Sequence, residues 1–243
     1  MVSGEIVLQK LGDFLFRWRN VVFPLTIMAI AGIFPPRLAH SSFDQLLLGL
    51  GLAVIVAGQS TRVLTVGWDY IERGGSGGKV AASRLVTRGM YAYCRNPMYV
   101  GNLLLVTGFL FAYGRLLAGI VGIACCTLFY SAIVAREECF LQEKFGTEFT
   151  KYRTHVPRWG FRSSLLLHDL KVRAVDVKAI LVREYSTLSV TALCALTITV
   201  WRVKGEQWQA MELAVLAAGS GFVLGFYLTI RYLKTRRIVY TPR

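Results

Sequence analysis

The sequence predicts an all-α protein, a polytopic bundle of about six transmembrane helices with a cap on its cytoplasmic side. Three observations predict it: 54% of the 243 residues are hydrophobic, the mean hydropathy is +0.49, and the 28 Lys and Arg residues gather between apolar stretches. A soluble domain of this size is less apolar, and a basic one would favour nucleic acid as its partner. Here topology and anionic lipid headgroups account for the charge, so no nucleic acid is expected.

Six apolar stretches supply the predicted spans, and they lie at about residues 21–38, 46–67, 98–113, 116–136, 186–202 and 210–230. A helix needs about 20 residues to cross the hydrocarbon core. The second, fourth and sixth stretches reach that length. The first, third and fifth need flanking residues or a locally thin bilayer. The length of the chain suits one membrane unit, so residues 1–243 are expected to form a single domain.

The Lys and Arg residues test this topology independently. They number three in the N-terminal tail, then one, five, one, ten and two in the successive loops, and five in the C-terminal tail. This alternation predicts a multi-pass protein with both termini in the cytoplasm, because cytoplasmic loops carry the excess of positive charge. Arg62 is the one Lys or Arg residue that this count assigns to a predicted span, where it would snorkel or pair within the bundle.

Two long cytoplasmic segments are expected. The first, residues 68–97, contains a Gly-Gly-Ser-Gly-Gly run at 74–78 that favours a flexible linker over a phosphate-binding loop, because no P-loop Lys follows. The second, residues 137–185, carries apolar residues near helical spacing. These fit equally an amphipathic helix on the membrane surface and an ordinary helix that caps the bundle, and they are Leu166, Leu170, Val177 and Leu181.

The five cysteines and three histidines have no spacing typical of a zinc or haem site, so no metal is expected. A more informative cluster follows from the short connection Tyr113-Gly114-Arg115, which predicts an antiparallel hairpin of the third and fourth stretches. The hairpin brings Arg95 close to Glu137 and Glu138 at the cytoplasmic face. Arg95 can hold a carboxylate, and either glutamate an ammonium, so the cluster suits a zwitterionic amino-acid group. Mutual pairing of these side chains at the interface is an equal alternative.

An ordered set of residues surrounds this hairpin. It comprises Leu85, Thr87, Gly89, Tyr91, the run Cys94-Arg95-Asn96-Pro97-Met98-Tyr99, Gly101, Glu137-Glu138, Phe145-Gly146, Tyr152 and Pro157-Arg158. The set resembles the isoprenylcysteine carboxyl methyltransferase family, which includes related bacterial membrane methyltransferases and phospholipid methyltransferases. The resemblance covers about residues 84–160, which it marks as a methyltransferase core. Residues 161–243, with the amphipathic segment and two further spans, lie outside it.

The resemblance implies a methyltransferase that binds S-adenosylmethionine at the cytoplasmic face, with Arg95 and Glu138 as its catalytic residues. By matching position, the cofactor-binding residues would be Gly89, Tyr91, Arg95, Asn96, Pro97, Tyr99, Gly101, Glu137 and Glu138. The family has a histidine where this chain has Asn96, whose amide forms hydrogen bonds but cannot act as a base near neutral pH.

The expected acceptor is a lipid or small hydrophobic molecule that enters from the bilayer and offers a carboxylate, thiol or amine. The lack of a histidine base favours an acceptor that is already anionic. Two other readings remain. A non-enzymatic scaffold or transporter would use Arg95, Glu137 and Glu138 structurally, and a sterol-reductase-like enzyme would use NADPH but is usually longer.

Overall fold

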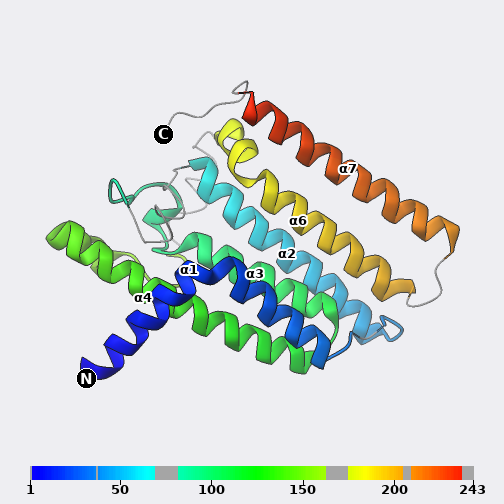
Figure 1. The fold of residues 1–243 in the computed structure, drawn as a ribbon, viewed down its shortest axis with the longest axis horizontal. Helices are drawn as coiled ribbons and strands as arrows, with labels where there is room; N and C mark the ends of the chain where they lie inside the picture. The colour runs from blue at the N-terminus through cyan, green and yellow to red at the C-terminus, as the bar shows by residue number, and fades with distance from the viewer. Residues whose placement is uncertain (1, 37, 69–81, 163–174, 205–208, 237–243) are drawn as a thin grey trace.

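The computed structural model describes residues 2–36, 38–68, 82–162, 175–204 and 209–236, and it confirms the all-α prediction. Over these residues the chain forms helices and no strand (Figure 1). The elements are α1 (Val2–Ile33), α2 (Ser42–Trp68), the 3-10 helix η1 (Gly89–Ala92), α3 (Pro97–Tyr113), α4 (Leu116–His155), α6 (Val177–Lys204) and α7 (Ala210–Thr235).

Five of these helices, α1, α2, α4, α6 and α7, are long and apolar enough to cross a membrane. The first and fifth predicted stretches gain the length they lacked, because α1 extends to 32 residues and α6 to 28. Only α3, with 17 residues, stays shorter than a typical span. Each of the six predicted stretches therefore falls largely within one helix, although the first was predicted to end five residues too late, and five of the six helices meet the length of a membrane span.

The predicted hairpin of α3 and α4 is confirmed. Pro97 begins α3, where its missing N–H costs no hydrogen bond. Gly114 ends the helix in the left-handed conformation, with φ of 78°, and its N–H donates to the carbonyl of Phe111. A residue with a Cβ adopts this conformation at a cost, so glycine suits the turn. Leu116 begins α4 only two residues later, which leaves no room for any connection but a tight reversal.

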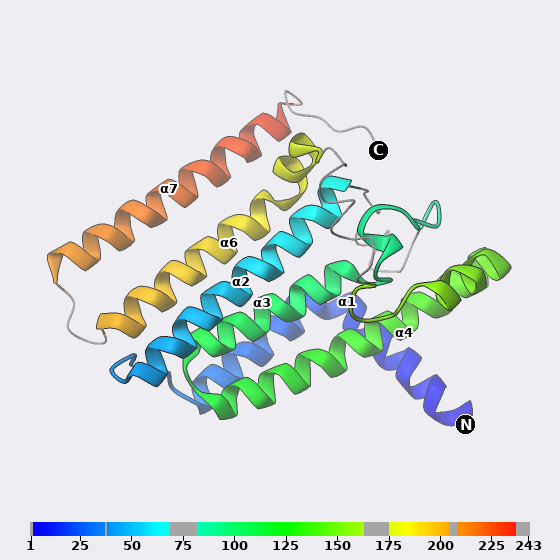
Figure 2. The same ribbon diagram turned by 180° about the vertical axis from the view of Figure 1, so that it is seen from behind.

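The bundle is built from three closely packed pairs. Helix α2 packs along α3, α1 packs along α4, and α6 lies between α2 and α7. Figures 1 and 2 show this order from opposite sides, with α7 at one edge and α4 at the other. The start of α1, the starts of α3 and α6 and the ends of α2, α4 and α7 all lie at one end of the bundle.

The contact between α2 and α3 is unusually close because glycines face each other along it. A Cβ placed on Gly108 would lie 2.7 Å from the carbonyl oxygen of Gly51, and one on Gly58 would lie 2.9 Å from that of Gly101. Small residues let two membrane helices approach backbone to backbone. One turn after Gly58, the side chain of Arg62 crosses the same contact, since a Cβ on Gly101 would lie 2.6 Å from its Cγ.

Two expectations for the cytoplasmic segments change. The run at 74–78 and the residues Leu166 and Leu170 lie outside the described residues. Val177 and Leu181 belong to α6, a candidate membrane span, rather than to a separate surface helix. The predicted fifth span therefore began too late, and a residue ahead of its predicted start pairs with Arg62 inside the bundle. This residue, Glu184, lies in α6, where an ion pair with Arg62 offsets the cost of burying its charge.

Candidate functional site

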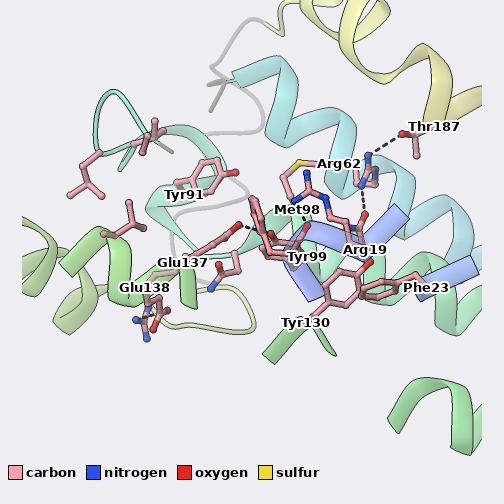
Figure 3. Close-up of a pocket in the computed structure, with 18 of the residues that line it drawn as sticks. Arg19, Phe23, Arg62, Tyr91, Met98, Tyr99, Tyr130, Glu137, Glu138 and Thr187 are labelled. Carbon is pink, nitrogen blue, oxygen red and sulfur yellow. Dashed lines mark hydrogen bonds and ion pairs between the residues drawn. The ribbon is translucent and has the colours of Figure 1, made fainter. Parts of the chain in front are cut away.

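One cavity of about 750 Å³ connects the candidate residues, at the end of the bundle where α3 begins. Residues of α1, α2, η1, α3, α4 and α6 line it, together with residues of the segments around η1: Ala82, Arg84, Leu85, Val86, Arg95 and Asn96. Figure 3 shows two groups of polar side chains with Met98 and Tyr99 between them. We call the first group the outer half, formed by Tyr91, Arg95, Glu137, Glu138 and Tyr152. The second group, the inner half, is formed by Arg19, Arg62, Asn102, Tyr130 and Thr187.

Glu138 is the centre of the outer half. Its Oε1 accepts a hydrogen bond of 2.9 Å from Arg95 Nη1, and its Oε2 accepts one of 3.0 Å from Arg158 Nε. This hydrogen bonding raises the pKa of the Arg158 guanidinium above its usual value. The Arg95 and Glu138 side chains are only 15% and 12% exposed, and Arg95 Nε is buried with no hydrogen-bond partner among the described residues. Glu138 is therefore a carboxylate shared by two guanidiniums.

Glu137, the neighbour of Glu138 on α4, is held by a different partner. The hydroxyl of Tyr99 on α3 donates a 2.6 Å hydrogen bond to its Oε1. The Tyr99 ring in turn packs against that of Tyr130, with centroids 5.2 Å apart. The two adjacent carboxylates are therefore oriented separately, Glu138 by arginines and Glu137 by a phenol at the boundary of the inner half (Figure 3).

A bend in α4 brings its last turns over the outer half. Gly146 has φ of 50° and ψ of −117°, which interrupts the helix. Its carbonyl oxygen accepts hydrogen bonds of 3.0 Å from Gln142 and 3.1 Å from Thr150, so side chains replace the lost helical bonds at this point. Beyond the bend Phe149 and Tyr152 line the cavity, and the Tyr152 hydroxyl donates a 2.7 Å bond to the carbonyl of Tyr91.

The segment after α4 clasps the segment before α3. The N–H of Arg95 donates to the carbonyl of Pro157 at 2.9 Å, and the Asn96 side-chain amide donates to the carbonyl of Arg158 at 3.2 Å. Asn96 therefore tethers the two segments in this chain. Cys94 is fully buried beneath the clasp, and burial raises the pKa of its thiol to about 11. It remains a protonated thiol at neutral pH and is unsuited to act as a nucleophile.

The inner half is organised by an ion pair between α2 and α6. Arg62 donates to Oε2 of Glu184 from Nε at 3.1 Å and from Nη2 at 2.9 Å. The same guanidinium donates to the Thr187 hydroxyl at 3.1 Å and to the side-chain oxygen of Asn102. The Arg62 and Glu184 side chains are 7% and 0% exposed, so the pair is buried within the bundle.

The structure brings six of the nine predicted cofactor residues to the cavity: Tyr91, Arg95, Asn96, Tyr99, Glu137 and Glu138. Gly89, Pro97 and Gly101 do not line it. Gly89 begins η1 with φ of 60°, Pro97 begins α3, and Gly101 admits the Arg62 side chain. These three shape the backbone around the site, and a direct role in ligand binding stays a prediction.

Sequence reasoning missed Arg19, Asn102, Glu184 and Thr187. Arg19 was assigned to the N-terminal tail, although α1 continues through it. Glu184 and Thr187 are three residues apart and so share one face of a helix, but that pattern is informative only if their segment is known to be a span. Asn102 is a lone polar residue in an apolar stretch, a weak signal that was available.

This architecture defines a class, the integral membrane helix bundle with a polar cavity at one end of its spans, and comparison with known proteins narrows it. The phospholipid methyltransferase family model matches residues 44–148. The chain is 32% identical to the cobalt-zinc-cadmium resistance protein CzcN of Cupriavidus metallidurans, over 65% of this chain and 70% of the relative. The chain therefore belongs to the phospholipid methyltransferase family, which is related to the isoprenylcysteine methyltransferases.

Two other relatives support this assignment over shorter regions. The nickel-cobalt-cadmium resistance protein NccN of Alcaligenes xylosoxydans xylosoxydans is 32% identical over 61% of this chain and 64% of its own length. The protein-S-isoprenylcysteine O-methyltransferase of Schizosaccharomyces pombe is 34% identical over 30% of this chain and 31% of its own length. The chain thus spans less than two thirds of each of these two. No solved structure matches it.

Proposed function

We propose that this protein is an S-adenosylmethionine-dependent membrane methyltransferase that acts on a lipid or a small hydrophobic acceptor. One observation carries the proposal. A guanidinium and two separately oriented carboxylates meet in the outer half of a cavity that continues between membrane helices. Membership of the phospholipid methyltransferase family supports the same conclusion.

The residues of the outer half fit the proposed cofactor. S-adenosylmethionine carries an ammonium, a carboxylate and an aromatic base, which need a carboxylate, a guanidinium and apolar surface respectively. Glu137 would take the ammonium. Arg95, whose buried Nε has no hydrogen-bond partner among the described residues, would take the carboxylate. Tyr91, Phe149 and Tyr152 line the same region and would hold the base.

When bound, the cofactor supplies an activated methyl group: an acceptor lone pair forms the new bond to the methyl carbon, and the electron pair of the broken carbon–sulfur bond leaves with the sulfur. The protein's task is then to hold donor and acceptor in line and to exclude water. Glu138 positions Arg95 and balances its charge, and Tyr99 positions Glu137. An anionic acceptor needs no base, whereas a neutral amine would transfer a proton to a carboxylate such as Glu138.

The topology supports a cytoplasmic site. The positive-inside rule predicts that both termini lie in the cytoplasm, and the outer half lies at the same end of the bundle as the start of α1 and the end of α7 (Figures 1 and 2). A water-soluble cofactor would enter there, and an apolar acceptor would enter from the bilayer. The two bacterial relatives are named for metal resistance. The described residues contain no group of three or more potential metal-ligating side chains, so the proposal assigns none of them to a metal.

Ligand binding by the purified protein in detergent tests the proposal. We expect S-adenosylmethionine and S-adenosylhomocysteine to raise the midpoint of thermal unfolding and to give a calorimetric binding signal, and NADPH to give neither. Stabilisation by NADPH alone would instead favour a reductase. Intact protein that binds no adenosyl ligand would contradict the proposal and favour a scaffold or transporter.

Two variants locate the binding site. Arg95→Ala and Glu138→Gln should each weaken S-adenosylhomocysteine binding by about tenfold or more, because a buried charged hydrogen bond is lost. Arg136→Ala is the matched control, since Arg136 adjoins Glu137 but pairs with Asp13 outside the cavity. It should bind as the wild type does. Equal binding by all four proteins would place the cofactor elsewhere. Incubation with labelled donor and a mixed lipid extract, followed by mass spectrometry, would identify the acceptor.

A further inference from the structure

The inner half of the cavity has a charge distribution that the proposed cofactor does not use. Arg19 and Arg62 line it, whereas both carboxylates that line the cavity, Glu137 and Glu138, belong to the outer half or its boundary (Figure 3). Glu184 neutralises Arg62 but is fully buried and does not line the cavity. A molecule in the inner half therefore meets the guanidinium, with the balancing carboxylate behind it.

Packing alone does not account for this pair. Burying an arginine and a glutamate between membrane helices costs desolvation energy that an apolar pair would avoid, so charged groups inside spans usually mark a functional pathway or site. The pair also borders the one cavity described above. Glu184, Thr187 and Asn102 together accept hydrogen bonds from Arg62, which fixes its orientation before any ligand arrives.

Two further groups converge on the same place. The Thr187 oxygen accepts a hydrogen bond from Arg62, so its O–H is directed elsewhere and can donate to a ligand in the cavity. Arg19 is held against α1 itself, with its guanidinium 4.3 Å from the ring centroid of Phe16 and Nη1 donating to the Phe16 carbonyl at 3.2 Å. Two guanidiniums and a hydroxyl are a donor set typical of an anionic group.

The walls of the inner half point to an apolar remainder of the ligand. Phe23 and Pro24 of α1 and Val190 of α6 line the cavity beside the two arginines. Helix α1 packs along α4, whereas α6 packs along α2 and α7, so the two helices that supply these walls belong to different sides of the bundle. A hydrocarbon chain lying between α1 and α6 would pass from the arginines toward the bilayer.

We propose that the inner half is the acceptor site, and that Arg62 and Arg19 bind the anionic head, a carboxylate or a phosphate, of an amphiphile. This inference rests on the proposed function, because the anionic head would then lie beside Tyr99 and Glu137, where the outer half begins. Arg62 is a specificity-determining residue of the acceptor site. Glu184 acts through Arg62 and is a positioning residue.

Photo-crosslinking tests the site without relying on turnover. The probes are a long-chain fatty acid that carries a diazirine near its carboxylate, and the alkyl phosphate, alcohol and amine of the same length. We expect the fatty acid, the phosphate or both to label residues 16–24 of α1 and 187–190 of α6. The labelling yield of the alcohol and the amine should be lower by about fivefold or more. The stronger of the two anionic probes identifies the head group.

Variants assign the selectivity to Arg62. Arg62→Met should reduce labelling by the anionic probes about fivefold or more, with S-adenosylhomocysteine affinity within about twofold of wild type. Arg202→Met is the matched control and should leave the labelling unchanged, because Arg202, a buried arginine of α6, lies at the opposite end of the bundle, where its Nη2 donates to the Asp44 carbonyl. If Arg62→Met does not fold, Thr187→Val keeps the ion pair and should lower labelling about twofold to fivefold.

The outcomes separate this inference from the proposed function. Equal labelling of the wild type and the variants, or equal labelling by charged and uncharged probes, would overturn the anionic acceptor site while leaving adenosyl binding intact. Arg62-dependent labelling in a protein that binds no adenosyl ligand would retain an anionic amphiphile site but overturn the methyltransferase proposal and the acceptor role. Arg62-dependent labelling together with adenosyl binding would support both.

Discussion

Two helix pairs of the bundle pack in opposite ways. Helices α2 and α3 meet backbone to backbone, and a Cβ on Gly51 would lie only 2.4 Å from the amide nitrogen of Ala112. Helices α6 and α7 meet through side chains: a Cβ on Gly219 would meet Leu196, but Gly221 and Gly225 have nothing within 4 Å. Most of α7 faces outward, and Phe222 is 79% exposed.

The close contact between α2 and α3 holds the residues of the site in position, whereas α7 exposes apolar side chains that lipid would cover. Close backbone contact determines how α2 and α3 lie against each other, and so places Arg62 beside Asn102. In a bilayer, packing of small residues supplies this specificity, since lipid solvates apolar side chains as well as protein does. The family model covers this pair and most of α4 but not α6 and α7, although α6 contributes Glu184 and Thr187.

The largest expected effect comes from enlarging a glycine in the α2–α3 pair, which we call the tight pair. Gly108→Val should lower the free energy of unfolding by at least about 3 kcal/mol, because its Cβ would lie 2.7 Å from the Gly51 carbonyl and from the backbone nitrogen of Ile55, neither of which can move alone. Gly225→Val, on α7, should change it by less than about 1 kcal/mol. Unfolding in detergent measures both, and similar losses would mean that the two pairs do not differ as described.

A smaller effect is expected from breaking the ion pair between Arg62 and Glu184, which links the α2–α3 pair to the α6–α7 pair. Glu184→Gln should cost about 2 to 3 kcal/mol of unfolding free energy, because Arg62 keeps hydrogen bonds but loses its buried counter-charge. Glu212→Gln is the matched change on α7. Its side chain accepts the Gln209 N–H in a capping box, which glutamine can also do, so the cost should stay below about 1 kcal/mol. Equal costs would contradict a special role of the α2–α6 ion pair.

Within the site, removal of one hydroxyl tests whether the tight pair orients the cofactor residues. Tyr99→Phe removes the 2.6 Å hydrogen bond to Glu137 and leaves the ring in place. We expect S-adenosylhomocysteine to bind about tenfold more weakly, since a hydrogen bond to a charged group contributes about 1.5 kcal/mol. Tyr113→Phe, which removes a bond to the Ala31 carbonyl at the other end of α3, should leave the affinity unchanged. Wild-type affinity in Tyr99→Phe would show that Glu137 needs no such support.

Local signals predicted much of this molecule. Hydropathy located six helices, and the short connection at Gly114 was enough to bring Arg95 close to Glu138. The pairing of Arg62 with Glu184 was out of reach, because it joins residues 122 positions apart and depends on which helices become neighbours. The same pairing explains why α6 was predicted too short, since hydropathy counts Glu184 as a free charge. Gly101 was predicted to line the cofactor pocket, which stays a prediction; the structure shows its contact with α2, and that contact depends on which helices become neighbours.

The smallest effect concerns the clasp beside the tight pair. Asn96→Ala removes the hydrogen bond to the Arg158 carbonyl and should cost about 1 kcal/mol of local stability. Cys94 reports this opening, because it is fully buried under the clasp and its raised pKa keeps it protonated and unreactive. Its alkylation at neutral pH should become about fivefold faster if modification follows local opening. Peptide mapping distinguishes alkylation of Cys94 from that of Cys125, a half-buried residue of α4 within the bundle. The alkylation rate of Cys125 should not change. An unchanged rate at Cys94 would show that the backbone bonds from Arg95 to Pro157 and from Arg162 to Tyr93 close the clasp without Asn96, and that Asn96 has the freedom to contact a ligand instead.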